Sequence, residues 1–530
     1  MELFAFYLYA VAFLLSGAII ELRFCFQVRF MNFNISNFSK NIICENQVTD
    51  TVVEAIVNGN TLDLYVTANA DRVKFIELNW AFESDENIYV LGDAWERSYG
   101  ELTFKRLRDC ERYMPWYFIA TNKQESFCFG VKTGPNAFVS FQYTPAGIKA
   151  LVDCRNGAYG VQLNGRRVHL ASFVYKSYDN AEVFTNLHDY CKTICEKPLL
   201  TKERVYGGNN WYYAYGKSSF EEIVTDAKVQ VELADGMGNK PFEVIDDCWQ
   251  INSCEGPWLP NEKFGDMKKL ADEIRNAGAR PGIWVRLLHN RDESITDEMR
   301  LLMKGKRKYL DPTHPAVKEL IKQDVERIKG WGYELLKHDF TTADLFGSWG
   351  PELNETITIT ENWHFYDRTK TNAEIVLELY RLIKETAGDM YVIGCNTISH
   401  LCAGLVEINR TGNDTSGREW EPTRKNGVNT LAFRLAQNEA FYMVDADCVG
   451  ILQGVIPWEK NKQWLHVLSY SNTPLFVSCT NNLSDEQKKD IKEAYRVYQQ
   501  KHTIKPLDVF ENTVPAKWEI DGETVEYNWD

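Results

Sequence analysis

The chain lacks the features by which several classes of protein are recognised. No run of lysine and arginine occurs in its 530 residues and its formal net charge is −15, whereas a nucleic-acid partner requires a basic face. Its 13 cysteines form no CxxC pair, and no Cys/His spacing is typical of a zinc site. We therefore expect no nucleic acid, no metal and no cofactor. A disulfide framework is not expected in a chain of this size, although an isolated bridge stays open.

The N-terminus lacks the basic residues with which a secretory signal begins, since the chain starts Met1-Glu2. Residues 3–20 are nonetheless almost all apolar and about long enough to span a membrane. Three interpretations of residues 1–30 stay open: a signal peptide, an anchor, or a false start upstream of Met31. The protein is then cytoplasmic or exported accordingly, and membrane contact is expected only if residues 3–20 are retained.

The first large part of the chain, residues 31–200, has the pattern of short strands. Alternating polar and apolar segments such as Thr61–Thr67 and Ala137–Tyr143 are separated by turn dipeptides such as Asn164-Gly165. Alternation buries one face of each strand, which is what two packed sheets require. We predict an N-terminal β-sandwich domain here, with a helical link at Glu182–Lys197.

After residue 200, strand-like segments alternate with amphipathic helical ones. The predicted strands are Asn209–Ala214, Phe242–Asp246, Arg280–Arg286, Tyr333–Phe340, Tyr391–Cys395, Leu405–Asn409, Ala440–Val444 and Pro474–Ser478. Eight such strands within residues 201–500 predict an α/β fold, a (β/α)8 TIM barrel. The rival, an open doubly wound sheet, is disfavoured because no glycine-rich phosphate turn follows the first strand. Residues 501–530 form a short tail with strand-like pieces.

Polar and aromatic side chains gather where the predicted strands end, which is where barrel enzymes place their active sites. The candidate site residues are Trp211, Asp246, Asp247, Trp284, Lys337, Asp339, Cys395, Asn396, Arg410, Asp414 and Asp447. A charged residue at one strand end is a weak signal, because solvation explains it equally well. A set of this size on one rim is far harder to ascribe to solvation.

Carboxylates and aromatic side chains in one pocket are what glycoside hydrolysis requires. One carboxylate attacks the anomeric carbon and a second protonates the leaving oxygen, at ~5 Å from the first in retaining enzymes. Lys337 and Asp339 face the same way on a strand, and a neighbouring ammonium favours an ionised carboxylate. Asp339 therefore suits the nucleophile. Asp414 lies in a loop that could cover a substrate and raise its pKa by desolvation, although Arg410 opposes that rise.

The other candidates suit the recognition of a sugar. Asp246 and Asp247 are natural acceptors for pairs of hydroxyl groups, and Trp211 or Trp284 could form a hydrophobic wall. His338, between Lys337 and Asp339, should face away from the substrate and be structural.

These residues resemble the α-galactosidase (melibiase) clan, glycoside hydrolase families 27 and 36. The resemblance is carried, in chain order, by Tyr206-Gly-Gly-Asn-Asn-Trp211, Val244-Ile-Asp-Asp-Cys-Trp249, Leu335-Leu-Lys-His-Asp339, the Arg410-to-Asp414 spacing and Asn472-Thr-Pro-Leu-Phe-Val-Ser478. The upstream β-sandwich is more similar to family 36. The usual C-terminal β-domain of the family is expected to be reduced or absent.

The resemblance implies a retaining α-galactosidase that acts on α-galactoside oligosaccharides through a covalent glycosyl-aspartate. It implies Asp339 as the nucleophile and Asp414 as the acid/base. Of the galactose hydroxyl groups, Asp246 and Asp247 would bind O4 and O6, Lys337 would bind O3 or O4, and Arg410 would bind O2. Trp211 would form a wall of the −1 subsite, and Asp447 matches the family less sharply.

Alternatives stay open. An α-N-acetylgalactosaminidase or a galactosyl transferase on the same scaffold would differ around the sugar 2-hydroxyl, where Cys395 and Asn396 are the expected determinants. A non-catalytic carbohydrate-binding protein is a second class. A metal-dependent barrel hydrolase using Asp246, Asp247, His338 and Asp339 is a third, disfavoured because no His-x-His ends a strand. Association into a homo-oligomer is also left open.

Overall fold

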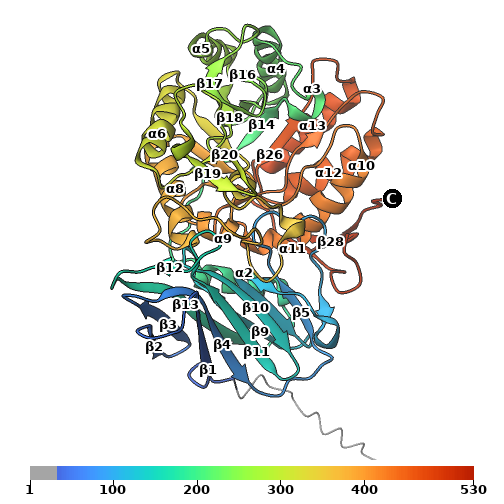
Figure 1. The fold of residues 1–530 in the computed structure, drawn as a ribbon. Helices are drawn as coiled ribbons and strands as arrows, with labels where there is room; N and C mark the ends of the chain where they lie inside the picture. Colours follow the sequence, from blue (N-terminus) through green and yellow to red (C-terminus); the bar gives the residue numbers. More distant parts are fainter. Residues whose placement is uncertain (1–32) are drawn as a thin grey trace, which may run out of the picture. The chain divides into compact units, whose positions relative to one another are not determined.

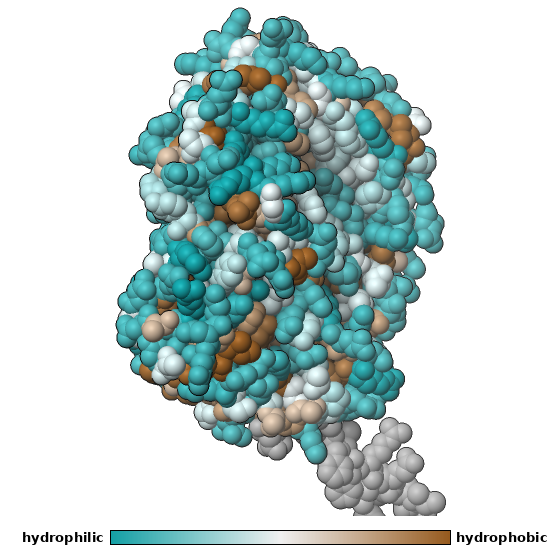
Figure 2. All heavy atoms as spheres, in the orientation of Figure 1, coloured by the Kyte–Doolittle hydropathy of each residue, from teal (hydrophilic) through white to brown (hydrophobic). Residues whose placement is uncertain are grey.

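A computed structural model of the chain describes residues 33–530 (Figure 1). The predictions for residues 1–30 lie outside this part. Within it, no helix is both long enough and apolar enough to cross a membrane. Hydrophilic side chains cover most of the face seen in Figure 2, and one of the hydrophobic patches among them lies over the sandwich strands.

The N-terminal region is a β-sandwich of two antiparallel sheets, as predicted. One sheet has the order β1-β4-β11-β10-β7, with β12 on β4, and the other has the order β2-β3-β13-β9-β8-β5-β6. Their bounds are β1 Ser39–Cys44, β2 Val52–Asn58, β3 Thr61–Thr67, β4 Arg72–Ala81, β5 Tyr89–Gly92, β6 Lys105–Arg106, β7 Met114–Pro115, β8 Tyr117–Thr121, β9 Ser126–Val131, β10 Phe138–Thr144, β11 Gly147–Asp153, β12 Val161–Gln162 and β13 Arg167–Tyr178. Aromatic rings fill the core between them: Trp80 lies 5.2 Å from Phe129, which lies 5.2 Å from Phe141. Helix α2, Val183–Ile194, leads out of the sandwich.

The second region is the predicted (β/α)8 barrel. Its parallel strands are β14 Tyr206–Asn209, β15 Phe242–Ile245, β18 Arg280–Val285, β21 Leu335–His338, β22 Tyr391–Gly394, β23 Ile408–Arg410, β24 Met443–Asp445 with β25 Val449–Gly450, and β26 Leu475–Ser478. The sheet order is β24-β23-β22-β21-β18-β15-β14-β26-β25. The seventh strand is thus in two pieces: β24 pairs with β23, and β25 pairs with β26. These pairings close the ring.

The first barrel strand is Tyr206–Asn209, so the prediction of Asn209–Ala214 was displaced. The aromatic residues that suggested a strand form the short helix α3, Trp211–Ala214. Strand β14 contains glycines because the neighbouring strand β15 approaches too closely to leave room for a side chain. A Cβ at Gly207 would lie 2.0 Å from the carbonyl oxygen of Phe242.

Strands six and seven also begin later than predicted, at Ile408 and Met443. The apolar residues before them close helical turns: the backbone N–H groups of Leu405 and Phe441 donate to carbonyls of the preceding turn. Buried turn residues therefore have the same apolar character as buried strand residues.

The helices of the barrel follow the predicted rhythm. They are α4 Phe220–Leu233, α5 Met267–Ala277, α6 Pro315–Gly330, α7 Thr341–Phe346, α8 Asn372–Ala387, α9 Ser399–Cys402, α10 Trp420–Pro422, α11 Asn429–Arg434, α12 Trp458–Tyr470 and α13 Asp485–Tyr498. Thr371 and Ser484 start α8 and α13 with capping boxes. Helices α7, α9, α10 and α12 were not predicted. Two hairpins extend loops at the barrel mouth: β16 Gln250–Asn252 with β17 Glu255–Pro260, and β19 Arg300–Met303 with β20 Lys306–Leu310.

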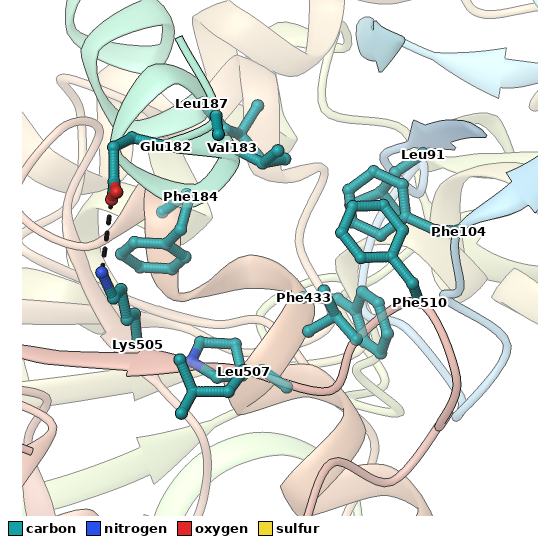
Figure 3. A pocket seen from close by; sticks show the side chains of 15 residues that line it. Leu91, Phe104, Glu182, Val183, Phe184, Leu187, Phe433, Lys505, Leu507 and Phe510 are labelled. Atoms are coloured by element: carbon teal, nitrogen blue, oxygen red, sulfur yellow. Dashed lines mark hydrogen bonds and ion pairs between the residues drawn. The ribbon is translucent and has the colours of Figure 1, made fainter. Parts of the chain in front are cut away.

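The last residues form a three-stranded antiparallel sheet of β27 Ile504–Pro506, β28 Lys517–Ile520 and β29 Glu523–Glu526. This segment borders an apolar cavity of about 180 Å³ together with α2, α11 and the sandwich. Figure 3 shows the ring of Phe510 beside that of Phe104, and the two rings are tilted by 39° with their centroids 4.6 Å apart. Glu182 and Lys505, which are paired at 3.2 Å, lie on the opposite side. The C-terminal segment therefore fastens sandwich and barrel to each other.

His400 of α9 is a second link between sandwich and barrel. Its ring stacks on Trp116 at 5.0 Å, and its Nε2 lies 2.8 Å from the carbonyl oxygen of Val131. Burial lowers the pKa of His400 to about 4. The folded protein therefore keeps this imidazole neutral.

We expect His400 to make the fold sensitive to acid. At pH 5 the His400 imidazole binds a proton in the unfolded chain, where the histidine pKa is about 6.5, but stays neutral in the folded chain. Acidification therefore favours unfolding. Above pH 6.5 this contribution to stability is complete, and it is lost as the pH falls towards 4. His400 alone should lower the unfolding free energy by about 2 kcal/mol between pH 7 and pH 5. Denaturant titrations should show a smaller fall for His400→Gln, and an equal fall in both proteins would contradict this account.

Candidate active site

Asp339 follows strand β21 directly and is held by groups at the barrel mouth. Its Oδ1 accepts a hydrogen bond from the backbone N–H of Phe340 at 2.7 Å, and its Oδ2 accepts one from Trp284 Nε1 at 3.1 Å. Burial alone would raise the pKa of Asp339, but the charges of Arg97 and Lys337, together with these two hydrogen bonds, outweigh it and lower that pKa. Asp339 is thus kept as a carboxylate.

Lys337 lies closest to Asp246 rather than to Asp339. Its Nζ is 2.7 Å from Asp246 Oδ2, and both side chains are buried. Asn209 Nδ2 donates to the same oxygen at 2.9 Å. The charge of the Lys337 ammonium group does lower the pKa of Asp339, as predicted. The direct ion pair of Lys337, however, is with Asp246, and it joins strands two and four. Lys337 and Asp246 form one polar unit on the rim.

Asp247 is engaged by its own loop. Its carboxylate accepts hydrogen bonds from Cys248 N and Gln250 Nε2, both at 2.7 Å, and from Ser253 Oγ at 3.1 Å and Cys254 N at 2.9 Å. The hairpin β16–β17 starts within this loop. Asp247 therefore holds the hairpin against the barrel mouth, and a role on sugar hydroxyls stays a prediction.

Arg410 is a buried hub at the end of strand six. Its Nε lies 3.1 Å from Asp445 Oδ2 and its Nη2 lies 2.6 Å from Asp447 Oδ1. Asp447, which has a positive φ of 79°, also accepts hydrogen bonds from Tyr212 Oη and from Thr415 N. Two carboxylates thus fix the guanidinium, and the Asp447 carboxylate in turn ties the loop that carries Asp414.

Asp414 sits at the open side of this hub, with half of its side chain exposed. Its Oδ1 faces two guanidinium groups, Arg97 Nη1 at 2.9 Å and Arg410 Nη1 at 3.4 Å. Within residues 33–530, which the structure describes, no residue donates a hydrogen bond to Asp414 Oδ2. One carboxylate oxygen is therefore anchored, and the other is available for proton transfer.

Arg97 comes from the sandwich and was not among the predicted site residues. The neighbouring Ser98 donates its backbone N–H to the carbonyl of Thr411 at 2.8 Å, and Asn413 N donates to the Ser98 carbonyl at 2.8 Å. This pairing inserts the Asp93–Ser98 segment beside the Asp414 loop. The charges of Asp339 and Asp414 both stabilise the charged form of Arg97, and Asp414 is its direct partner at 2.9 Å. The available signal in the sequence was a cluster of charged and aromatic residues that lacks the alternation of the strands around it.

Glu96 reinforces the same insertion through residues that follow strands β21 and β22. Its carboxylate accepts hydrogen bonds from Asn396 Nδ2 and Tyr99 Oη, both at 2.6 Å, and from Gly350 N at 2.7 Å. Burial raises the pKa of Glu96. Asn396 is fully buried and committed to the sandwich contact through its Nδ2. It therefore joins the two domains at the rim.

Cys395 and Trp211 complete the predicted set. Cys395 is buried directly after strand β22, and burial, together with the charge of Asp339, raises the pKa of its thiol. Trp211 is half-buried on α3, 5.7 Å from the ring of Tyr215. Its backbone N–H donates to Asn209, the residue that also contacts Asp246.

His338 points away from this cluster, as strand alternation predicts. Its ring lies 5.8 Å from Tyr380 of α8 and its Nδ1 is 3.3 Å from Thr341 Oγ1. Burial lowers the pKa of His338 to about 4. Within residues 33–530, no group of three or more His, Cys, Asp or Glu side chains is arranged to hold a metal ion. His338 is thus a structural residue.

Replacing Arg97 with glutamine should move the acidic limb of the pH–rate profile. Without this positive charge the pKa of Asp339 rises, so Asp339 becomes ionised only at higher pH. The acidic limb of kcat/KM should shift upward by roughly one pH unit, because kcat/KM reports the free enzyme. Arg108→Gln, an exposed arginine of the same domain, is the matched control. An unmoved limb in Arg97→Gln would remove Arg97 from this role.

Solved structures that match this combination of sandwich and barrel include α-galactosidases, and those from Geobacillus stearothermophilus are described as members of glycoside hydrolase family 36. The expected likeness to that family is therefore confirmed at the level of the fold. No protein-family model matches the chain, and no curated protein matches it.

Three of these structures define the likeness. The α-galactosidase TtGalA of Thermus thermophilus, solved with p-nitrophenyl α-D-galactopyranoside, has a TM-score of 0.61 and 15% identity over 90% of this chain and 99% of its own. A variant of AgaA from Geobacillus stearothermophilus, solved with 1-deoxygalactonojirimycin, has a TM-score of 0.60 and 14% identity over 88% and 70%. The galactosidase domain of the α-galactosidase–sucrose kinase AgaSK has a TM-score of 0.55 and 14% identity over 89% and 74%.

Proposed function

We propose that this protein is a retaining glycoside hydrolase that releases terminal α-linked galactose from oligosaccharides. The observation that carries the proposal is Arg97, which donates to Asp414 at 2.9 Å and whose charge also lowers the pKa of Asp339. One guanidinium therefore acts on two carboxylates that follow different barrel strands. Their environments differ as the two roles require. Asp339 is held ionised by charges and hydrogen bonds, whereas Asp414 is half-exposed with one oxygen uncommitted.

The reaction would proceed in two displacements. Asp339 attacks the anomeric carbon while Asp414 donates a proton from Oδ2 to the leaving oxygen, and a glycosyl-aspartate forms. Asp414 then removes a proton from water, which attacks the anomeric carbon and frees Asp339. Arg97 and Arg410 hold Oδ1 of Asp414 in both steps, so the carboxyl group keeps its orientation while its charge changes.

The rest of the rim supplies recognition of the sugar. Lys337 and Asp246, paired at 2.7 Å, offer a donor and an acceptor to neighbouring hydroxyl groups. Arg410 lies on the same rim with its guanidinium fixed by Asp445 and Asp447. The related structures were solved with p-nitrophenyl α-galactopyranoside, stachyose and raffinose, which supports an α-galactoside as the partner.

Two alternatives on the same scaffold remain proposals of lower rank. An α-N-acetylgalactosaminidase needs space for an acetamido group near Cys395, which is fully enclosed in the structure. A galactosyl transferase would differ in whether water or a sugar reaches the glycosyl-aspartate. Association into a homo-oligomer also stays a prediction.

A screen of p-nitrophenyl glycosides tests the proposal. We expect hydrolysis of the α-galactoside, with the α-N-acetylgalactosaminide, α-glucoside and β-galactoside cleaved at least about 100-fold more slowly. Transfer would appear as galactosylated acceptor when melibiose is added. Turnover of the β-galactoside in preference to the α-galactoside, or of none of the four, would refute the proposed function.

A further inference from the structure

A cavity of about 350 Å³ lies between the sandwich and the long loop after strand β21. It is lined by Ala94, Trp95, Arg97, Tyr99, Glu101, Arg112, Tyr113, Pro115, Gly350, Pro351, Leu353 and Asn354. Its two walls are joined where Trp95 Nε1 donates to the carbonyl of Asn354 at 3.0 Å. Its size is within the range of sites for small ligands.

Arg97 links the cavity to the candidate acid, Asp414, which does not itself line it. Arg97 lines it and also donates through Nη1 to Asp414 at 2.9 Å. In a glycosidase the acid stands beside the oxygen of the leaving group, so the space next to it receives the part of the substrate that departs. The cavity is therefore placed for the leaving group rather than for the galactose.

Two arginines in the cavity wall have unused capacity to bind an anion. Arg97 is 7% exposed, and its Nε has no hydrogen-bond partner. Arg112 donates to the backbone carbonyls of Asp93 at 2.6 Å and Gly92 at 3.5 Å, and among residues 33–530 it has no ion pair within 4.0 Å. A partly buried guanidinium without a carboxylate partner is costly, and burial lowers the pKa of Arg112.

The carboxylates near the cavity act on Arg112 only through their charge, and none of them is paired with it directly. Glu101 lines the cavity and accepts a hydrogen bond from the backbone N–H of Tyr99. Asp414 faces Arg97 from the active site, and Asp93 is paired with Arg434 at 2.8 Å. Arg112 is thus the guanidinium of this cavity wall that lacks a carboxylate at ion-pair distance, and a ligand carboxylate could take that place. The nearby charge of Glu101 disfavours a doubly charged phosphate. Tyr99 and Tyr113, both half-buried, supply rings on which a sugar can pack.

We propose that this cavity binds the leaving group of the substrate and favours leaving groups that carry a carboxylate, as in a galactoside of an acidic sugar. The proposal rests on the proposed function. The carboxylate would receive hydrogen bonds from Arg112 and from Nε of Arg97, and the sugar part would pack on the tyrosines.

Melibiose and melibionate, which differ by oxidation of the reducing end to a carboxylate, form the test pair. We expect kcat/KM for melibionate to exceed that for melibiose about tenfold in the unaltered protein, as one charge-assisted hydrogen bond allows. The ratio should fall to about one in Arg112→Gln. It should keep its original value in Arg108→Gln, whose arginine is exposed and outside the cavity.

A second variant covers the case in which Arg112→Gln does not fold. Asn354 is exposed and engages the sandwich only through its backbone carbonyl, so Asn354→Asp adds a negative charge to the lining at little structural cost. We expect this variant to lower the ratio as well. A ratio of one or below in the unaltered protein, with melibiose cleaved, would overturn the inference and leave the proposed function intact.

Calorimetric titration separates the two proposals further, because it needs no turnover. D-Gluconate should bind to the unaltered protein more tightly than D-glucose, and Arg112→Gln should lose this difference. Equal binding of both would overturn the anion site whether or not galactosides are cleaved. Cleavage of neither disaccharide, with selective binding of gluconate, would refute the proposed hydrolase while supporting the anion site.

Discussion

Asp339→Gly should reduce hydrolysis of p-nitrophenyl α-galactoside on the order of 10⁴-fold or more, since the carbon–oxygen bond to the enzyme can no longer form. Substrate should still bind, because Lys337 stays paired with Asp246 and Arg410 stays paired with Asp445. Sodium azide should partly restore turnover by entering the space left by the carboxylate. The product should be β-galactosyl azide, because the azide attacks the face opposite the departing group.

The matched control is Asp389→Gly, an exposed aspartate in the turn before β22. It should hydrolyse the substrate as the unaltered protein does. Thermal melting should show that Asp339→Gly folds. Full activity in folded Asp339→Gly, or an azide product of α configuration, would remove Asp339 from the role of nucleophile.

Asp414→Ala should separate substrates by their leaving groups. Melibiose, whose leaving sugar needs a proton, should lose about 10²–10⁴-fold in kcat/KM. The p-nitrophenyl galactoside should form the glycosyl-aspartate at a nearly normal rate, since nitrophenolate leaves unaided, and its slow step becomes attack by unactivated water.

Azide should then accelerate the breakdown of that intermediate and give α-galactosyl azide, the opposite anomer to the one from Asp339→Gly. The comparison of the two variants under one set of conditions is therefore internally controlled. Equal losses on both substrates, without any effect of azide, would contradict the assignment of Asp414 as acid/base.

The sequence predicted the barrel well because its signals are local. Helices such as α6 and α8 carry amphipathic periodicity and clear starting residues. Strand boundaries were weaker where apolar residues close a buried turn, as before Ile408 and Met443. At the first strand, the close approach of Phe242 to Gly207 replaces the side-chain pattern that identifies a strand.

The candidate site was predictable in so far as it lies on one rim. Every residue that ends a parallel barrel strand shares that rim, so strand order alone brings Asp246, Lys337, Asp339 and Arg410 together. Pairings across the rim were not encoded locally, and the direct partner of Lys337 proved to be Asp246.

The contribution of the sandwich escaped sequence reasoning altogether. The hydrogen bond from Arg97 to Asp414 joins residues 317 apart in the chain, and it depends on how one domain docks on another. The hydrophobic periodicity of helices and strands carries no information about how two domains dock. Three ties create it: the Ser98 pairing with the Asp414 loop, the Glu96 contact with Asn396, and the packing of the C-terminal segment.

The stereochemistry of the first-formed sugar tests the central claim most directly. Proton NMR during early hydrolysis of p-nitrophenyl α-galactoside distinguishes α-galactose from β-galactose before mutarotation mixes them. Two successive displacements, at Asp339 and then by water activated at Asp414, predict α-galactose first. Initial release of β-galactose would mean a single displacement by water, and the covalent role given to Asp339 would be wrong.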